Sequence, residues 1–161
     1  MKSCHKTFMG IIGLALLLAL TAGPALAGDN PGLKGWEPDG EYNQLYKVSE
    51  GDEFKAEILE IKEVTPMAGM DPGLAMMVRD RDEYEVLVHL GPVSFVSDHG
   101  LKVGDKVKIR GAWAELDGQE IFIASKIKRG EDYSYKVRLT KDGTPFWTLT
   151  PEELAKERSG D

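Results

Sequence analysis

The sequence predicts an all-β fold, a small barrel of five or six strands preceded by an extended N-terminal arm. Three observations lead to this expectation. After residue 50, apolar and polar residues alternate with period two in five or six short segments, and turn residues separate these segments. Helical periodicity is almost absent. The first segment changes its apolar phase midway, which indicates a bulge and favours a barrel over a sandwich.

The first 27 residues have the layout of a secretory signal peptide. Lys2 and Lys6 give a basic start, the run 10–20 is almost wholly apolar, and Ala25-Leu26-Ala27 matches a cleavage site. We therefore predict export to the periplasm, cleavage after Ala27, and no stable membrane span in the mature protein. A membrane anchor is the alternative, although the apolar run is about half of the ~20 residues that a spanning helix needs.

Composition excludes several function classes. The chain has 161 residues, a net charge of −7 and one cysteine. Cleavage after Ala27 would leave 134 residues, a net charge of −9 and no cysteine, because Lys2, Cys4 and Lys6 leave with the signal peptide. Such a protein has no disulfide framework, no four-cysteine metal site and no thiol chemistry. The acidic balance argues against nucleic acid as a partner.

Residues 28–50 are rich in Gly, Pro, Asn and Asp and show no periodicity, so we predict an extended arm or linker. Its aromatic residues Trp36, Tyr42 and Tyr46 are costly to leave in water, and part of the arm is expected to lie against the domain. A disordered tether is the alternative. The barrel is predicted over 51–147 and a charged tail over 148–161.

The first strand begins near Phe54, whose face includes Ala56 and Ile58, and then the apolar phase moves to Leu59 and Ile61. This change predicts a bulge or bend. Leu74–Val78 and Tyr84–Leu90 are predicted as the second and third strands, with a polar turn over 79–82. Gly91-Pro92 is expected to stop the third strand, and Val93–His99 to form a short helical turn.

The second half of the barrel is predicted from a hairpin and a last strand. Lys106–Trp113 alternates, Asp117-Gly118 is a strong hairpin turn signal, and a return strand follows through Ile127. Tyr133–Leu139 is predicted as a closing strand, and Thr150-Pro151-Glu152-Glu153 as a helix-capping box. A bent strand, a hairpin, a short helical element and another hairpin give the order of an OB-like barrel.

Several short motifs are spread along the chain. They are Gly35-Trp36, Tyr42-Asn43-x-Leu45-Tyr46, Val64-Thr65-Pro66-Met67, Val88-His89-Leu90-Gly91-Pro92, Gly104-Asp105-x-Val107, Gly118-x-x-Ile121, and Val137-Arg138-Leu139 with Asp142-Gly143-x-Pro145-x-Trp147. Together these motifs resemble those of one exported bacterial family, the C-terminal domain of the magnetosome proteins MamS and MamX. The resemblance implies an OB-like periplasmic module. The chain lacks the haem-attachment motif CxxCH of MamX-type proteins, so cytochrome function is not implied.

No constellation in the sequence indicates catalysis, so we predict a non-enzymatic binding module without a cofactor. His89 stands at the end of a predicted strand, directly before a Gly-Pro that fixes the chain direction. We expect a protein partner or small ligand to bind at the barrel mouth, formed by 89–95 and the loop 67–73. The predicted ligand-binding residues are His89, Gly91, Pro92, Phe95 and Trp113.

A metal carrier is the alternative function. Four methionines fall within 67–77, and thioether sulfur selects Cu(I) among the available metals. Met67 and Met70, with His89, are the predicted copper ligands in this alternative. Methionine also commonly fills gaps in apolar cores.

A basic patch extends across the predicted hairpin, and OB barrels commonly bind single-stranded nucleic acid through such grooves. It consists of Lys106, Lys108, Arg110, Lys126, Lys128 and Arg129. A solvated outer face explains these residues equally well. With export and a mature charge of −9, we predict no nucleic-acid partner.

Overall fold

The computed structural model describes residues 31–159; the predicted signal peptide lies outside this range. The six strands are β1 (Gly51–Val64), β2 (Gly73–Asp80), β3 (Glu85–Pro92), β4 (Lys106–Leu116), β5 (Gln119–Arg129) and β6 (Tyr133–Lys136). The helical elements are α1 (Glu41–Gln44), η1 (Val48–Glu50), α2 (Val93–Val96), η2 (Phe146–Thr148) and α3 (Pro151–Ser159).

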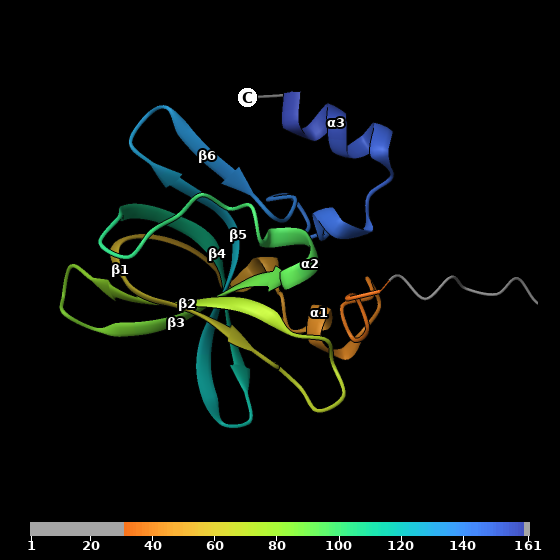
Figure 1. Cartoon of the computed structure of the whole chain (residues 1–161). Helices are drawn as coiled ribbons and strands as arrows, with labels where there is room; N and C mark the ends of the chain where they lie inside the picture. The colour runs from red at the N-terminus through yellow and green to blue at the C-terminus, as the bar shows by residue number, and fades with distance from the viewer. Residues whose placement is uncertain (1–30, 160–161) are drawn as a thin grey trace, which may run out of the picture.

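The six strands form one mostly antiparallel sheet, and five of them close it into a ring (Figure 1). The strand order is β3-β2-β1-β4-β5-β6, and an additional parallel pairing joins β3 to β5 through Val88↔Phe122 and His89↔Ile123. The predicted all-β, OB-like class is confirmed, as is the short helix after the third strand. Ring closure comes from β3 and β5; the last strand, β6, pairs only with the end of β5.

The bend predicted in the first strand is confirmed. β1 pairs with β4 over 51–57 and with β2 over 56–64, and its register against β2 shifts between Ile58 and Glu60. The shift falls where the apolar phase changes in the sequence. It allows one long strand to serve both halves of the ring.

The hairpin turn and the helix-capping box predicted from the sequence are both confirmed. Asp117 and Gly118 connect β4 to β5 with positive φ angles of 51° and 76°, as a two-residue hairpin turn requires. At the start of α3, the Thr150 N–H donates to Glu153 Oε2 at 2.9 Å and the Glu153 N–H to Thr150 Oγ1 at 3.3 Å. This is the reciprocal pairing of a capping box.

β3 ends at Pro92, as predicted from Gly91-Pro92, and both residues still pair with Leu74 and Gly73 of β2. One predicted strand boundary is wrong. The segment predicted as a strand over Tyr133–Leu139 leaves the ladder after Lys136. The Val137 and Arg138 N–H groups both donate to the Ser125 carbonyl, at 2.9 and 3.1 Å, which turns the chain away from β5.

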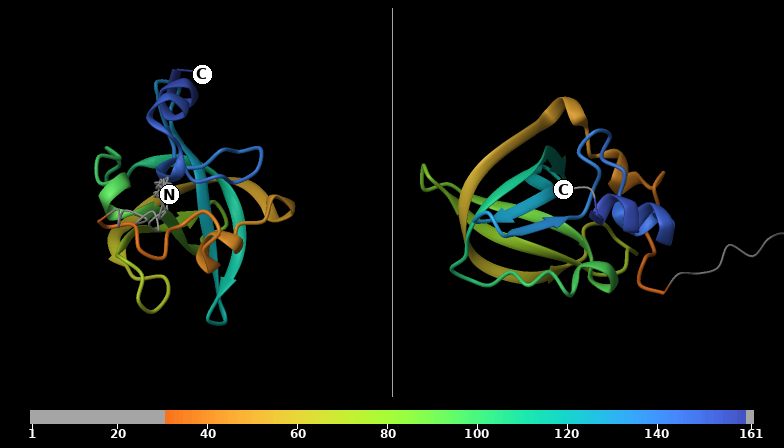
Figure 2. Two further views of the ribbon diagram at one scale, coloured as in Figure 1. Left: turned by 90° about the vertical axis from the view of Figure 1, so that its right-hand side faces the viewer. Right: turned by 90° about the horizontal axis from the view of Figure 1, so that it is seen from above.

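The core fills the ring and extends to one of its ends. Inside the ring, residues such as Ile58, Met76, Val88 and Ile109 are fully buried. At the end, Trp36 and Tyr42 from the arm and Phe146 and Trp147 from the C-terminal segment are also buried. Figures 1 and 2 show α1, α2 and the C-terminal segment gathered at this end, and the β2–β3 turn at the opposite end. Within residues 31–159, no helix has the length and apolar character to cross a membrane.

Candidate functional site

The arm covers the end of the ring where the sequence places a ligand-binding mouth. The Tyr42 hydroxyl lies 3.0 Å from His89 Nδ1, and the two rings stack with centroids 5.9 Å apart. His89 is only 3% exposed. Burial raises the pKa of Tyr42 and lowers that of His89 from 6.5 to about 4. At neutral pH His89 is therefore an uncharged imidazole, and its Nδ1 shares a hydrogen bond with the uncharged Tyr42 hydroxyl.

The structure brings together four of the five predicted ligand-binding residues. Pro92 directly precedes α2, Phe95 lies within that helix, and Gly91 and His89 come immediately before them on β3. The Trp147 ring packs on Gly91, where an added Cβ would stand 2.6 Å from Cζ3, and it meets Phe95 edge-on at 5.9 Å. The mouth residues are therefore in contact with the chain's own aromatic side chains.

Trp113, the fifth predicted ligand-binding residue, belongs to a different cluster. Its ring stacks on Phe54 at 6.0 Å and meets Phe122 edge-on at 4.9 Å. Its indole N–H donates to Asp52 Oδ2 at 3.1 Å. These contacts fix Trp113 on β4 beside β1 and β5.

The predicted copper ligands Met67 and Met70 lie in the β1–β2 loop and pack against the core. The Met70 N–H donates to the Met67 carbonyl at 3.2 Å, and the Met70 side chain rests on Gly35 of the arm. In residues 31–159, no group of three His, Cys, Asp or Glu side chains is arranged to hold a metal. Methionine is not among these four residue types, so a copper site formed by Met67, Met70 and His89 stays a prediction.

Arg138 fastens the arm to the C-terminal segment, a role that its alternating sequence context did not indicate. Its guanidinium donates to Asn43 Oδ1 at 2.7 Å and to the Gly143 carbonyl at 3.2 Å. It also lies 5.4 Å from the Tyr46 ring centroid and 4.9 Å from that of Trp147. Arg138 is 1% exposed, and burial lowers its pKa. In the described part of the chain, its Nε has no hydrogen-bond acceptor.

The buried neutral state of His89 predicts a stability loss in mild acid. Because its folded pKa is about 4 and its unfolded pKa about 6.5, the unfolded chain binds the extra proton between these values. The stabilisation is complete above pH 6.5 and declines as pH falls towards 4, by about 3 kcal/mol in total. Urea unfolding of wild type and His89→Gln at several pH values measures this. His89→Gln should flatten the slope in this window, whereas His99→Gln should retain most of it.

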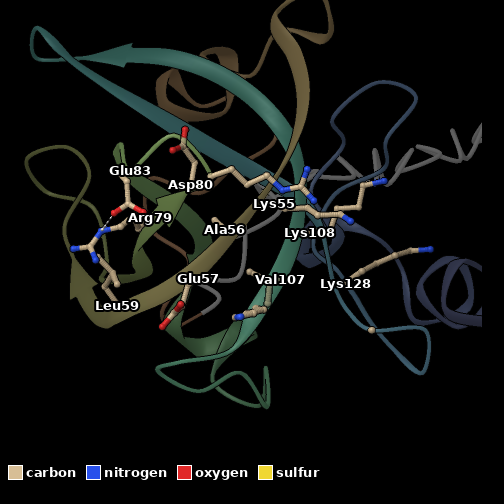
Figure 3. A pocket seen from close by; sticks show the side chains of 13 residues that line it. Lys55, Ala56, Glu57, Leu59, Arg79, Asp80, Glu83, Val107, Lys108 and Lys128 are labelled. Carbon is tan, nitrogen blue, oxygen red and sulfur yellow. Dashed lines mark ion pairs between the residues drawn. The ribbon is translucent and has the colours of Figure 1, made fainter.

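A second candidate site lies at the other end of the ring, away from the arm. It is a trough of about 630 Å³ that crosses β1 between the β2–β3 turn and the strands β4 and β5 (Figure 3). Ala56, Leu59 and Val107 give it an aliphatic floor. The cations that line it are Lys55, Arg79, Arg81, Lys106, Lys108 and Lys128, and its carboxylates are Glu57, Asp80 and Glu83.

Some of the cations that line the trough form ion pairs with carboxylates, and others do not. Arg79 pairs with Glu85 at 2.9 Å and with Glu83 at 3.9 Å, and Lys108 pairs with Glu53 at 2.5 Å. Lys55, Lys106 and Lys128 have no ion pair among residues 31–159. Figure 3 shows the Lys55, Lys108 and Lys128 side chains on one side and the Arg79–Glu83 pair on the other. Uncompensated positive charge therefore gathers on the β4–β5 side.

The trough uses only part of the basic patch read from the sequence. Lys106, Lys108 and Lys128 line it, but Arg110 borders a separate hollow beside Tyr46. Arg129 pairs with Asp105 at 2.6 Å and lies over the Tyr133 ring. The alternating lysines over 106–108 indicated a basic surface in the sequence. No sequence pattern indicated that β1 and the β2–β3 turn also line the trough.

Comparison with known proteins yields a family and a distant structural likeness. The model of the MamS/MamX magnetosome protein family matches residues 51–134, which comprise β1 to β5 and the start of β6. No curated protein matches the chain. A chain in a structure of a replication protein A heterotrimer bound to single-stranded DNA aligns at 12% identity with a TM-score of 0.40. That alignment covers 52% of this chain and 60% of the other.

Proposed function

The chain belongs to the MamS/MamX magnetosome protein family, and on this basis we propose that it is a non-enzymatic periplasmic binding module. Its ligand surface is the trough across β1, and its ligand is an anionic small molecule or the acidic part of a protein partner. The family assignment and the OB-like ring are compatible with a binding role. The trough is the feature that carries the proposal.

The charge of the trough is the observation that favours an anionic ligand. Six cations and three carboxylates line it, a formal surplus of three positive charges in a chain whose net charge is −7. A local reversal of sign in a hollow concentrates counter-charged ligands from solution. The aliphatic floor of Ala56, Leu59 and Val107 adds apolar contact beneath the lysine stems. A volume of about 630 Å³ lies within the usual range for ligand sites.

Neutralising two unpaired lysines should weaken anion binding. We expect tripolyphosphate and tetraglutamate to bind the wild-type protein at low ionic strength, and Lys106→Gln/Lys128→Gln to weaken both by about tenfold. Isothermal titration calorimetry measures the change. The matched control is Lys47→Gln/Lys156→Gln, which removes two exposed charges from the arm and α3. Equal weakening in both double variants, or no binding by wild type, would contradict the proposal.

The ligand site predicted at the mouth and the copper alternative stay predictions. A ligand there would have to displace Tyr42 from His89 and Trp147 from Gly91. A copper ion would need the sulfur atoms of Met67 and Met70, which pack on the core. The trough requires no such displacement, and for this reason we prefer it.

A further inference from the structure

We infer that the trough receives an extended polypeptide segment whose charges are segregated, with acidic residues at one end and basic residues at the other. This inference rests on the proposed function and narrows it to one class of partner. It follows from the separation of charge along the trough, from its lining and from one exposed aromatic side chain.

One side of the trough is mainly cationic, with four lysines and one carboxylate, Glu57, which pairs in register with Lys106. Lys106 and Lys108 project from the start of β4 and Lys128 from the end of β5, and Lys55 lies beside them on β1. Among residues 31–159, Lys108 alone in this group has a carboxylate partner, Glu53. The positive charges come from three strands and are spread along the trough, which suits several carboxylates in succession. Lysine presents a point charge on a flexible stem and imposes no bidentate geometry on them.

The other side is formed by the β2–β3 turn, whose net charge over 79–85 is −2, although the four of its residues that line the trough are two arginines and two carboxylates. The β2–β3 turn carries two arginines and four carboxylates over Arg79–Glu85, and the arginine Arg79 is already paired with Glu83 and Glu85. A second hollow of about 300 Å³ shares Lys55, Asp80, Arg81 and Lys108 with the trough and extends it to Asp82. A ligand that spans the trough therefore meets a lysine-rich side first and then the carboxylates and arginines of the β2–β3 turn.

This polarity disfavours a uniform polyanion. A nucleic acid or a polyphosphate lying along the trough would place negative charge against Asp80, Asp82 and Glu83. Proteins that bind single strands also stack bases on aromatic rings. Among the described residues, those that line the main trough include no aromatic side chain, and Phe54 lines only the smaller hollow beside it. A polypeptide can carry both signs in the required order, and its aliphatic atoms match the floor.

Tyr84 adds an anchor of the kind that protein interfaces use. It is 70% exposed at the end of the β2–β3 turn, next to the side of the trough that this turn forms. Its backbone is held there, because the Tyr84 N–H donates to Asp80 Oδ1 at 2.9 Å and its carbonyl accepts from the Asp80 N–H at 2.9 Å. Exposed, rigidly placed tyrosines are enriched among residues that dominate binding energy.

The test uses peptides of equal composition and the full chain. Two block peptides join a run of glutamates to a run of lysines through a glycine spacer, in either order, and a third alternates the two residues. Tripolyphosphate and a short oligothymidylate are the uniform anions. Binding is measured by calorimetry at low ionic strength. We expect one block peptide to bind at least about tenfold more tightly than the alternating peptide and the oligothymidylate.

A variant of the β2–β3 turn distinguishes binding of a peptide with segregated charges from general attraction of anions to the lysines. Asp82→Asn/Glu83→Gln should weaken the preferred block peptide by about fivefold and tighten tripolyphosphate, because repulsion of the anion falls. The control Glu115→Gln/Glu120→Gln removes two exposed carboxylates from the β4–β5 hairpin and should change neither.

Three outcomes overturn the inference while leaving the proposed function in place. They are equal binding of block and alternating peptides, tighter binding of the oligothymidylate, and a block-peptide affinity that Asp82→Asn/Glu83→Gln leaves unchanged. Failure of tripolyphosphate, tetraglutamate and every peptide to bind would overturn the proposed function itself.

Discussion

Replacement of Trp36 by alanine is expected to lower the free energy of unfolding by about 3–5 kcal/mol. Trp36 is 1% exposed and meets Tyr42 edge-on at 4.8 Å and Trp147 at 5.7 Å. Its ring lies directly on Gly73, where an added Cβ would stand 2.5 Å from Cζ2. The variant would remove these contacts and leave a large cavity between the arm, β2 and the C-terminal segment. Urea unfolding followed by circular dichroism measures the loss.

Trp36→Phe is the control for this prediction. It keeps an aromatic ring but loses the indole N–H that donates to the Asp71 carbonyl at 2.9 Å, so a loss of about 1–2 kcal/mol is expected. The Trp36 carbonyl, which accepts from Trp147 Nε1 and Asn43 Nδ2 at 2.8 Å each, remains in both variants. A loss below about 1 kcal/mol for Trp36→Ala would mean that the arm does not fold as one unit with the ring.

The features that the sequence predicts correctly are those that depend on neighbouring residues. The bulge follows from a phase change within 54–61, the hairpin turn from Asp117-Gly118, and the helix start from Thr150 and Glu153. In each case the residues that determine the structure lie within one strand or one turn. Such patterns can be recognised in the sequence without knowledge of the fold.

The features that sequence reasoning misses depend on partners far along the chain. Alternation placed Arg138 on a polar strand face, but its partner Asn43 lies 95 residues away. Alternation also placed Tyr84 with Val86 and Val88 on the apolar face. In the structure, Tyr84 is the last residue of the β2–β3 turn and its side chain is exposed to solvent. The arm was expected to contact the domain, but no local sequence pattern indicates which end of the ring it covers.

The candidate site illustrates the same limit. Lys106, Lys108 and Lys128 were visible as a basic patch, but the trough exists only because the bend of β1 brings Lys55 and Leu59 between β4 and the β2–β3 turn. The separation of its charges is likewise a property of the closed ring. Composition alone would have assigned an acidic chain no anion site.

The second large effect is expected at Arg138, where two opposing terms must be weighed. Burying a guanidinium without a carboxylate partner is costly, and Arg138→Met would remove that cost. The same change would leave Asn43 Oδ1 and the Gly143 carbonyl without the donors that Arg138 supplies, at about 1–3 kcal/mol for each buried acceptor. It would also remove the cation–π contacts with Tyr46 and Trp147. We expect the losses to dominate and the free energy of unfolding to fall by about 2–4 kcal/mol.

A double-mutant cycle with Asn43→Leu isolates the bond between the two residues. If the orphaned amide oxygen accounts for much of the loss, Arg138→Met and Asn43→Leu together should cost less than their sum, with a coupling of about 1–2 kcal/mol. Urea unfolding of the four proteins gives this coupling, and Arg110→Met on the exposed face of β4 provides a matched arginine change. A coupling near zero would mean that Arg138 stabilises the arm by packing between Tyr46 and Trp147 alone. A measurable coupling would establish that this long-range hydrogen bond joins the arm to the C-terminal segment and so keeps the mouth of the ring covered.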